Sequence, residues 1–271
     1  MVRFFSILIL ILSSLSSFAF DKRSITFQKF PLKGSLPNST VKRIFQDQKG
    51  YIWLGTESGI CRYDGYKLTT IKSNIEHPNL LTSGNILCIA EDKQHRIWFG
   101  TDRGVNIIDE NLQIVTLFAK HKVQDLRINS ILCDSNGDIW IGSENGLFVY
   151  NTAKKTLKSY FHSKDPMSIP GNNINQITQD KAGNIWIALW NDGLCRFNNK
   201  YETFESLPRF GKSNNPFSVY EDSDGIFWVG TWSDGLFKVE FSKQTDLPIY
   251  TQFLHNDNNP NSVAEKLKTS G

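Results

Sequence analysis

Five tryptophans recur along this chain at nearly constant spacing, and each follows an aspartate by six residues. The tryptophans are Trp53, Trp98, Trp140, Trp186 and Trp228, and the aspartates are Asp47, Asp92, Asp134, Asp180 and Asp222. Successive tryptophans are 45, 42, 46 and 42 residues apart. Five identical offsets do not arise by chance, so the chain is a tandem repeat. A period of this length is typical of a solenoid, a propeller or a similar array.

Glycines recur in the same frame. Most copies carry glycine three residues after the aspartate and two residues after the tryptophan, with His95 and Ala188 as the exceptions. A further glycine ends the next turn in all five copies, and the last two copies have one extra residue before it. Such glycines predict turns that need positive φ and places where another sheet comes close.

The residues between these markers alternate between apolar and polar, as in half-buried strands. In the first copy the pattern predicts strands at 41–46, 51–56, 60–63 and 68–71, joined by turns that contain Asp or Gly. The equivalent first strands are expected at 86–91, 128–133, 174–179 and 216–221. Four antiparallel strands per repeat indicate a propeller blade, and a β-sandwich lacks such a strict period. We therefore expect an all-β propeller with about five four-stranded antiparallel blades.

The repeated tryptophans and the cysteines are expected to be structural. Each indole should lie between adjacent sheets and bury roughly 150–250 Å². The cysteines are Cys61, Cys88, Cys133 and Cys195, and they show neither a CxxC pair nor a metal-ligand spacing. We expect them to be mostly buried free thiols that pack as small apolar residues.

The first twenty residues indicate a secretory signal. Arg3 precedes an apolar stretch at 4–12, and Ser17-Phe18-Ala19 offers small residues before a cleavage position. We expect residues 1–19 to be a cleaved signal peptide, with an uncleaved membrane anchor as the alternative. No later segment is long and apolar enough for a membrane helix. A periplasmic or otherwise extracytoplasmic location follows.

Several classes of function are disfavoured by the sequence. The formal net charge is +3 without a basic stripe, which argues against nucleic-acid binding. There is no GxSxG, HExxH or P-loop motif. The acidic turns at 134–138 and 222–225 lack the twelve-residue frame of a calcium loop. We expect no catalytic residues, no metal site and no cofactor.

The repeat has a recognisable family pattern. The first copy, LPNSTVKRIFQDQKGYIWLGTESGICRYDGYKL, closely resembles the two-component regulator propeller repeat. The third copy, INSILCDSNGDIWIGSENGLFVYN, and the fourth, INQITQDKAGNIWIALWNDGLCRFN, are similar to it as well. The resemblance covers roughly residues 30–262.

That resemblance implies the periplasmic sensor region of a hybrid two-component histidine kinase, which in many members responds to a carbohydrate or its breakdown product. The implied partners are a small ligand such as an oligosaccharide, and the remainder of a sensor kinase or another sensor copy. The family's kinase, receiver and membrane helix have no counterpart in this sequence, so no enzymatic activity is expected. A protein-interaction scaffold and an exported propeller enzyme that acts on polysaccharide remain alternatives.

The blade number is open. The family pattern implies about seven blades, and residues 256–262 resemble the opening of a sixth copy, whereas residues 263–271 leave the pattern. We expect residues 20–262 to form an incomplete seven-bladed propeller of a truncated sensor, followed by a divergent tail. The alternative is a complete five-bladed ring closed by a strand at residues 25–30.

Candidate ligand contacts come from the one-residue insertions in the last two copies. Each places a second tryptophan beside an aspartate: Trp190 with Asp192, and Trp232 with Asp234. An aromatic face next to a polar group suits a sugar ring, and propellers commonly bind ligands with loops at one end of the blades. The alternative is that Trp190 and Trp232 only pack against neighbouring blades.

Overall fold

The structure is a computed structural model that describes residues 36–71, 81–115, 117–118, 121–242, 244–245, 247–259 and 262–263. The chain divides into Met1–Lys33 and Gly34–Gly271, and the description below concerns the second unit. The predicted signal peptide, the alternative closing strand at 25–30 and residues 264–271 of the predicted tail lie outside the described residues.

Within the described residues, twenty strands form five four-stranded antiparallel sheets, which confirms the predicted all-β fold with five blades. The first sheet contains β1 (Val41–Gln46), β2 (Ile52–Thr56), β3 (Ile60–Tyr63) and β4 (Leu68–Ile71). The second contains β5 (Ile86–Glu91), β6 (Ile97–Thr101), β7 (Gly104–Ile108) and β8 (Ile114–Val115), and a short 3₁₀ helix, η1 (Lys122–Asp125), follows it. The third contains β9 (Ile128–Cys133), β10 (Ile139–Ser143), β11 (Gly146–Asn151) and β12 (Thr156–Tyr160). The fourth contains β13 (Ile174–Gln179), β14 (Ile185–Leu189), β15 (Gly193–Asn198) and β16 (Thr203–Ser206), and the fifth contains β17 (Pro216–Glu221), β18 (Phe227–Thr231), β19 (Leu236–Phe241) and β20 (Pro248–Phe253).

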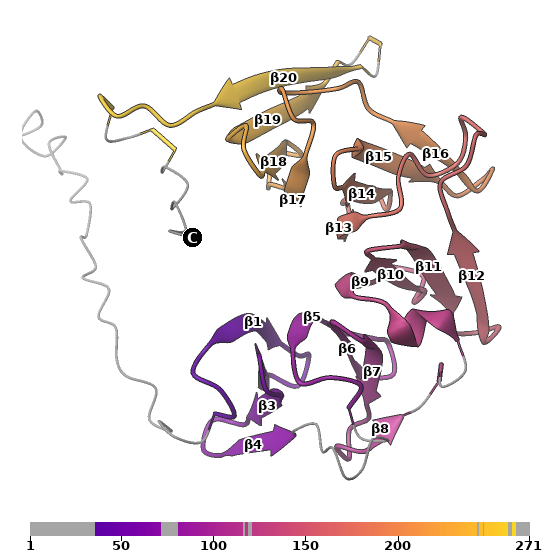
Figure 1. Cartoon of the computed structure of the whole chain (residues 1–271), viewed down its shortest axis with the longest axis vertical. Coiled ribbons are helices and arrows are strands. Elements are labelled where there is room, and N and C mark those ends of the chain that lie inside the picture. Colours follow the sequence, from indigo (N-terminus) through magenta and orange to yellow (C-terminus); the bar gives the residue numbers. More distant parts are fainter. Residues whose placement is uncertain are drawn as a thin grey trace, which may run out of the picture. The chain divides into compact units, whose positions relative to one another are not determined.

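The sheets are arranged radially. Each sheet is a meander in which every strand pairs with the next one along the chain. The first strands β1, β5, β9, β13 and β17 contact one another in succession, so they form the inner wall. Figure 1 shows the five sheets in chain order around a central space, with the fourth strands on the outside. This is the arrangement of propeller blades.

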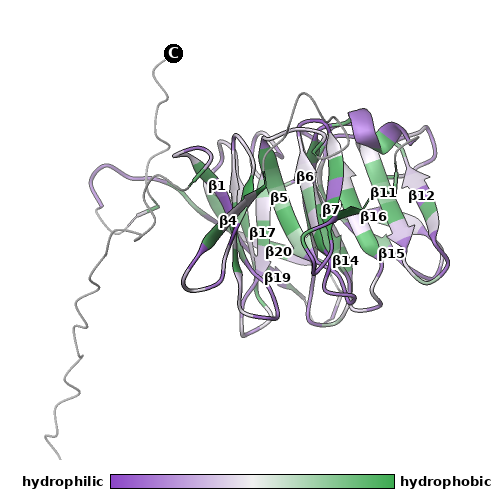
Figure 2. Cartoon of the chain, turned by 90° about the horizontal axis from the view of Figure 1, so that it is seen from below, coloured by the Kyte–Doolittle hydropathy of each residue, from purple (hydrophilic) through white to green (hydrophobic). Residues whose placement is uncertain are grey.

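The second strands show the effect of this stacking on burial. Every residue of β6, β10 and β14 is buried, because each of these strands has a neighbouring sheet on both faces. In the fifth sheet β18 is only partly buried. Figure 2 shows apolar residues concentrated on the strands and polar residues in the connecting loops. A strand buried on both faces carries a nearly continuous apolar run, and the sequences of these three strands fit that rule.

The repeated aspartate fixes both a turn and a tryptophan. In all five copies its Oδ2 accepts a hydrogen bond from Nε1 of the tryptophan six residues later, at 2.6–2.9 Å. Its Oδ1 accepts from the backbone N of the residue four positions on. The residue three positions on has positive φ in every copy, and it is glycine except for His95 at 59°. Each indole N–H thus has a partner, which a buried tryptophan requires.

Four of the five tryptophans pack against the following sheet, as predicted. Trp53 belongs to a core cluster with Ile86 and Ile97 of the second sheet. The other contacts are Trp98 with Tyr150, Trp140 with Phe197, and Trp186 with Phe227, at ring centroid separations of 5.9, 4.9 and 5.0 Å. Trp228 belongs to the last sheet and is half-buried. The recurring tryptophan is therefore part of the contact between successive blades in these four copies.

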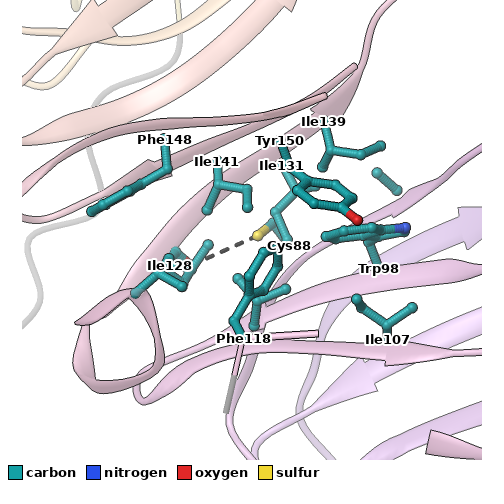
Figure 3. Packing of buried hydrophobic residues seen from close by; sticks show 13 residues of the cluster. Cys88, Trp98, Ile107, Phe118, Ile128, Ile131, Ile139, Ile141, Phe148 and Tyr150 are labelled. Atoms are coloured by element: carbon teal, nitrogen blue, oxygen red, sulfur yellow. Dashed lines mark hydrogen bonds between the residues drawn. The ribbon is translucent and has the colours of Figure 1, made fainter. Parts of the chain in front are cut away.

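The core between the second and third sheets shows how this contact is built. Trp98 lies beside Tyr150, and Cys88 lies between them and Ile128 (Figure 3). Sγ of Cys88 donates to the backbone O of Ile128 at 3.7 Å, which joins β5 to β9. Burial raises the pKa of Cys88 to about 12, so this thiol stays protonated and packs as a small apolar group. Cys61 and Cys195 are also buried and Cys133 is half-buried, as expected for mostly buried thiols.

The glycine two residues after the tryptophan lets the next sheet come close. A Cβ atom at Gly142 would lie 2.5 Å from Cγ2 of Ile174 in the following sheet. The same relation holds at 2.7 Å for Gly55 with Ile86 and at 2.6 Å for Gly100 with Ile128. In the fourth copy Ala188 replaces the glycine, and the following sheet has Pro216 where the others have isoleucine. The one copy that lacks this glycine is therefore followed by the one sheet that lacks the facing isoleucine.

Two loops share a hydrogen-bond pattern. Nδ1 of His162 contacts the backbone O of Ile169 at 3.0 Å, and Nδ1 of His255 contacts that of Val263 at 2.8 Å. The hydroxyls of Ser168 and Ser262 accept from the backbone N of Ser163 and Asn256, respectively. The first loop leads into β13, the inner strand of the fourth sheet. The two loops thus share these hydrogen bonds, while the assignment of residues 256–262 to the opening of a further copy stays a prediction.

Candidate functional site

Every inner strand contains a β-bulge near its first residue. The pairing with the second strand skips one residue in each sheet: Lys42 in β1, Leu87 in β5, Asn129 in β9, Asn175 in β13 and Phe217 in β17. A bulge redirects the skipped side chain and is frequent beside functional sites. Four of these five residues line the same pocket. The bulged residues of four blades therefore contribute side chains to one pocket.

That pocket has a volume of about 290 Å³ and takes residues from all five sheets. Its lining consists of Arg43, Leu87, Arg127, Asn129, Glu144, Asn173, Asn175, Trp190 and Phe217. Because the inner strands surround the central space in Figure 1, the pocket lies at the centre of the blades, at the end where the inner strands begin. We call it the central pocket. A concave site with a few convergent polar groups is the usual form of a small-molecule site.

The rim of the central pocket is formed by the hairpins that follow the second strands. The residue four positions after the repeated tryptophan is acidic in the first three copies and tryptophan in the last two: Glu57, Asp102, Glu144, Trp190 and Trp232. In the last three sheets the backbone N of this rim residue donates a hydrogen bond to the backbone O of the residue directly before the inner strand. These bonds are Glu144 to Arg127 at 3.0 Å, Trp190 to Asn173 at 2.8 Å and Trp232 to Asn215 at 3.1 Å. The rim is thus charged on one side and aromatic on the other.

The aromatic side brings two of the predicted contacts together. The rings of Trp190 and Trp232 meet edge to face, with centroids 5.4 Å apart. Phe217 lies against Trp232 at 5.8 Å. Trp232 is 46% exposed and Phe217 is 49% exposed, and the pocket is lined by Trp190 and Phe217. The two tryptophans thus contact each other across two blades, and Trp190 also lines the pocket, while their contact with a ligand stays a prediction.

The polar side is held in place by bonds between sheets. Nδ2 of Asn129 donates to the backbone O of Ile174 at 2.9 Å. Nδ2 of Asn175 donates to the backbone O of Pro216 at 2.7 Å. Oδ1 of Asn129 accepts from Nε of Arg127 at 3.1 Å, which positions that guanidinium. The amides therefore join neighbouring inner strands and give the pocket a fixed polar wall.

The two predicted aspartates lie beside the rim rather than in the pocket lining. Oδ2 of Asp234 accepts from both the backbone N and Oγ of Ser213, at 2.7 Å each. Burial raises the pKa of Asp234, but the hydrogen bonds from Ser213 outweigh it, and the net pKa is lowered. Asp192 packs on Gly171, and there burial raises the pKa while His162 lowers it only in part. The Asp234 carboxylate thus supports the loop that leads into β17, whereas Asp192 lies against the loop that leads into β13.

Sequence reasoning missed most of the pocket. Arg43, Arg127, Asn129, Asn175 and Phe217 gave no motif, because they come from four separate copies and from columns without a constant residue. The available signal was variability: the second and third positions of the inner strands change from copy to copy, whereas the fourth position is isoleucine in four copies and valine in the last. In a repeat protein such a column marks a surface that packing does not constrain.

Among the described residues, no group of three or more His, Cys, Asp or Glu side chains could hold a metal ion. In the same part of the chain, no helix has the length and apolar character needed to cross a membrane.

Comparison with known proteins gives a family for the repeat. The model described as "Two component regulator propeller" matches residues 35–58, 80–103, 122–145, 168–191 and 211–233. Each matched segment contains one inner strand, the aspartate turn and the strand that carries the tryptophan. The five matches correspond to the five sheets.

Individual relatives are much longer than this chain. Histidine kinase P4 of Formosa agariphila is 28% identical over 132 residues, which are 46% of this chain and 10% of that protein. The extracellular domain of a hybrid two-component system from B. thetaiotaomicron is 25% identical with a TM-score of 0.68, over 84% of this chain and 30% of that domain. The chain therefore spans a tenth of the curated relative and under a third of the structural one.

Enzymes share the fold as well. Virginiamycin B lyase of Staphylococcus aureus has a TM-score of 0.60 at 14% identity, over 78% of this chain and 69% of the lyase. At that level of identity the likeness concerns the fold alone.

Proposed function

This chain carries five repeats of the two-component regulator propeller family, and from that premise we propose that it is an extracytoplasmic ligand-sensing module of a two-component signalling system. The observation that carries the proposal is the central pocket, which is lined by the inner strands of all five sheets. The similar solved structure is the extracellular domain of a hybrid two-component system, and the curated relative is a histidine kinase. A signal peptide at residues 1–19 would export the module.

The ligand in this proposal is a small saccharide. Its ring would lie with its C–H face on Trp190 and Phe217, because an aromatic ring offers a flat apolar surface. Its hydroxyls would meet Asn129, Asn175 and Glu144, which supply amide and carboxylate groups to the same pocket. An apolar wall combined with a few fixed polar groups gives both affinity and orientation.

Sensing would use the position of the pocket between the blades. Neighbouring inner strands are joined by side-chain bonds such as that of Asn129 to β13 and that of Asn175 to β17. A ligand that contacts several inner strands at once favours one relative arrangement of the sheets. Such a ligand shifts a two-state equilibrium by the difference between its affinities for the two states. The remainder of a sensor kinase, or another sensor copy, would respond to that shift, and the module itself would bind without catalysis.

The proposal is tested by binding measurements on variants of the aromatic side. Trp190→Ala and Trp232→Ala, singly and together, are compared with the parent chain by calorimetry against a panel of neutral and acidic oligosaccharides. The double variant should lose at least tenfold in affinity, about 1.4 kcal/mol, while its circular dichroism is unchanged. Tyr201→Ala is the matched control, since Tyr201 is 64% exposed in the hairpin between β15 and β16, at the opposite end of the fourth sheet. Unchanged affinity in a folded double variant would falsify the proposed site.

A further inference from the structure

Two guanidinium groups line the central pocket without a carboxylate partner. Nη1 of Arg43 donates to the backbone O of Lys42 at 2.8 Å, and Nε of Arg127 donates to Oδ1 of Asn129 at 3.1 Å. Both arginine side chains are exposed, and within the described residues neither guanidinium makes an ion pair. The adjacent Lys42, by contrast, pairs with Glu57 at 2.9 Å. The pocket therefore holds two cations whose charge is not neutralised by a direct contact.

One carboxylate faces these cations. Glu144 lines the same pocket, and its Oε1 accepts a long hydrogen bond of 3.4 Å from the backbone N of Arg127. The formal charge of the lining is thus +1, from two arginines and one glutamate. The acidic rim residue of the second copy, Asp102, is bound by Asn85 at 3.3 Å and does not line the pocket.

We propose that the ligand of the central pocket is an acidic saccharide, whose carboxylate or sulfate group is bound by Arg43 and Arg127 while its ring lies on Trp190 and Phe217. This inference rests on the proposed function and adds the charge of the ligand to it. Arginine suits this role because its planar fork matches the two oxygens of a carboxylate or sulfate. Glu144 then accepts a hydrogen bond from a hydroxyl group of the same ligand, and its charge disfavours a second anionic group close by.

The first experiment compares charged and neutral forms of one saccharide. Calorimetry on the full chain uses tetragalacturonate and its fully methyl-esterified form, which has the same rings without the charge. A sulfated chondroitin disaccharide and its desulfated form make up the second pair, and sodium sulfate alone tests for binding of a small anion. We expect one charged form to bind at least tenfold more tightly than its neutral counterpart, with affinity that falls as salt is added.

Charge variants then locate the effect. Arg43→Gln and Arg127→Gln should each lower the affinity for the charged probe about tenfold and leave that for the neutral probe nearly unchanged. Glu144→Gln keeps the shape and the acceptor oxygen, and it should raise the affinity for the charged probe severalfold. Lys200→Gln is the control, because it removes one charge from the hairpin between β15 and β16, at the opposite end of the sheet.

The possible outcomes separate this inference from the proposed function. Equal affinity for charged and neutral probes, with loss of both in Trp190→Ala, would overturn the acidic ligand and leave a saccharide site. Binding of sulfate alone as tightly as of the sulfated disaccharide would overturn the role of the ring. Absence of binding by every saccharide of the panel would overturn both. A gain for Glu144→Gln that is confined to the charged probe would support the inference, since a purely structural role of Glu144 does not predict it.

Discussion

Trp98 donates its indole N–H to Oδ2 of Asp92 at 2.6 Å, and both side chains are almost completely buried. Oδ2 of Asp92 also accepts a hydrogen bond from Nε of Arg96 at 2.6 Å. Oδ1 of Asp92 accepts hydrogen bonds from two backbone N atoms of the turn. One aspartate therefore closes a hairpin, neutralises a cation and satisfies the indole that contacts the next sheet. This explains in physical terms why the six-residue offset is constant.

Replacing Asp92 should be costly. Asp92→Ala leaves the indole N–H of Trp98 and the guanidinium of Arg96 without their acceptor in a buried site, which should cost about 3 kcal/mol of unfolding free energy. The change is measured by urea unfolding followed by tryptophan fluorescence and circular dichroism. Asp222→Ala in the last sheet is the matched control and should cost less, because Asp222 is more exposed. Equal losses at the two positions would contradict this account.

A second matched pair tests the contact between sheets. Trp98 is completely buried against the third sheet, whereas Trp228 occupies the same place in the last sheet and is half-buried. Trp98→Ala should destabilise the chain by about 3–5 kcal/mol, as expected for a large side chain removed from a core. Trp228→Ala should cost clearly less in the same denaturant titration. The reverse order would show that the sheets do not stack through this column.

The glycine column predicts a specific coupling. In Gly142→Ala the new methyl group would lie 2.5 Å from Cγ2 of Ile174, which is too close. Overpacking of this kind costs about 1–3 kcal/mol of unfolding free energy. Ile174→Ala removes that methyl group and costs stability through the lost packing. The double variant should lose less than the sum of the two single losses, and a double-mutant cycle from urea unfolding measures the difference. Strict additivity would mean that the two residues do not limit how closely the sheets approach.

The repeat made the fold predictable to a large extent. The five inner strands begin and end at the predicted residues, for example Val41–Gln46 and Ile174–Gln179. This succeeded because each strand is bounded by an aspartate turn whose chemistry is local, and because five copies average out the ambiguity of any single one. The role of the aspartate was only partly foreseen: its bonds to the turn followed from its residue type, whereas its bond to the indole depends on the hairpin geometry.

The central pocket was predictable only in part. Trp190 and Trp232 stood out because each adds a second tryptophan beside an insertion, and the structure places Trp190 in the pocket lining and Trp232 against it. Asn129 and Arg127 could not be found in this way, since a pocket made by residues about 40 positions apart has no local pattern. The bulge that aims Asn129 toward the centre is a property of the strand pairing and leaves no residue-type signal.

Asp192 and Asp234 occupy the same place in successive copies, yet their environments shift the carboxyl pKa in opposite directions. Burial raises the pKa of Asp192, and His162 offsets only part of that rise. At Asp234 burial acts in the same sense, but the hydrogen bonds from Ser213 to the carboxylate prevail and the pKa is lowered below 3.8. The two residues should therefore contribute to stability over different pH ranges.

The sign follows for each residue. Asp234 stabilises the fold above its ordinary pKa, and this contribution is lost as the pH falls through the lowered value, so Asp234→Asn should reduce stability at pH 7 and have little effect near pH 2. Asp192 favours the fold in its protonated form, and that contribution is lost as the pH rises through the raised value. Asp192→Asn should therefore increase stability at pH 7 and change it little near pH 3. Urea unfolding of the parent and both variants across this range tests the contrast, and responses of the same sign at pH 7 would rule out the opposed environments.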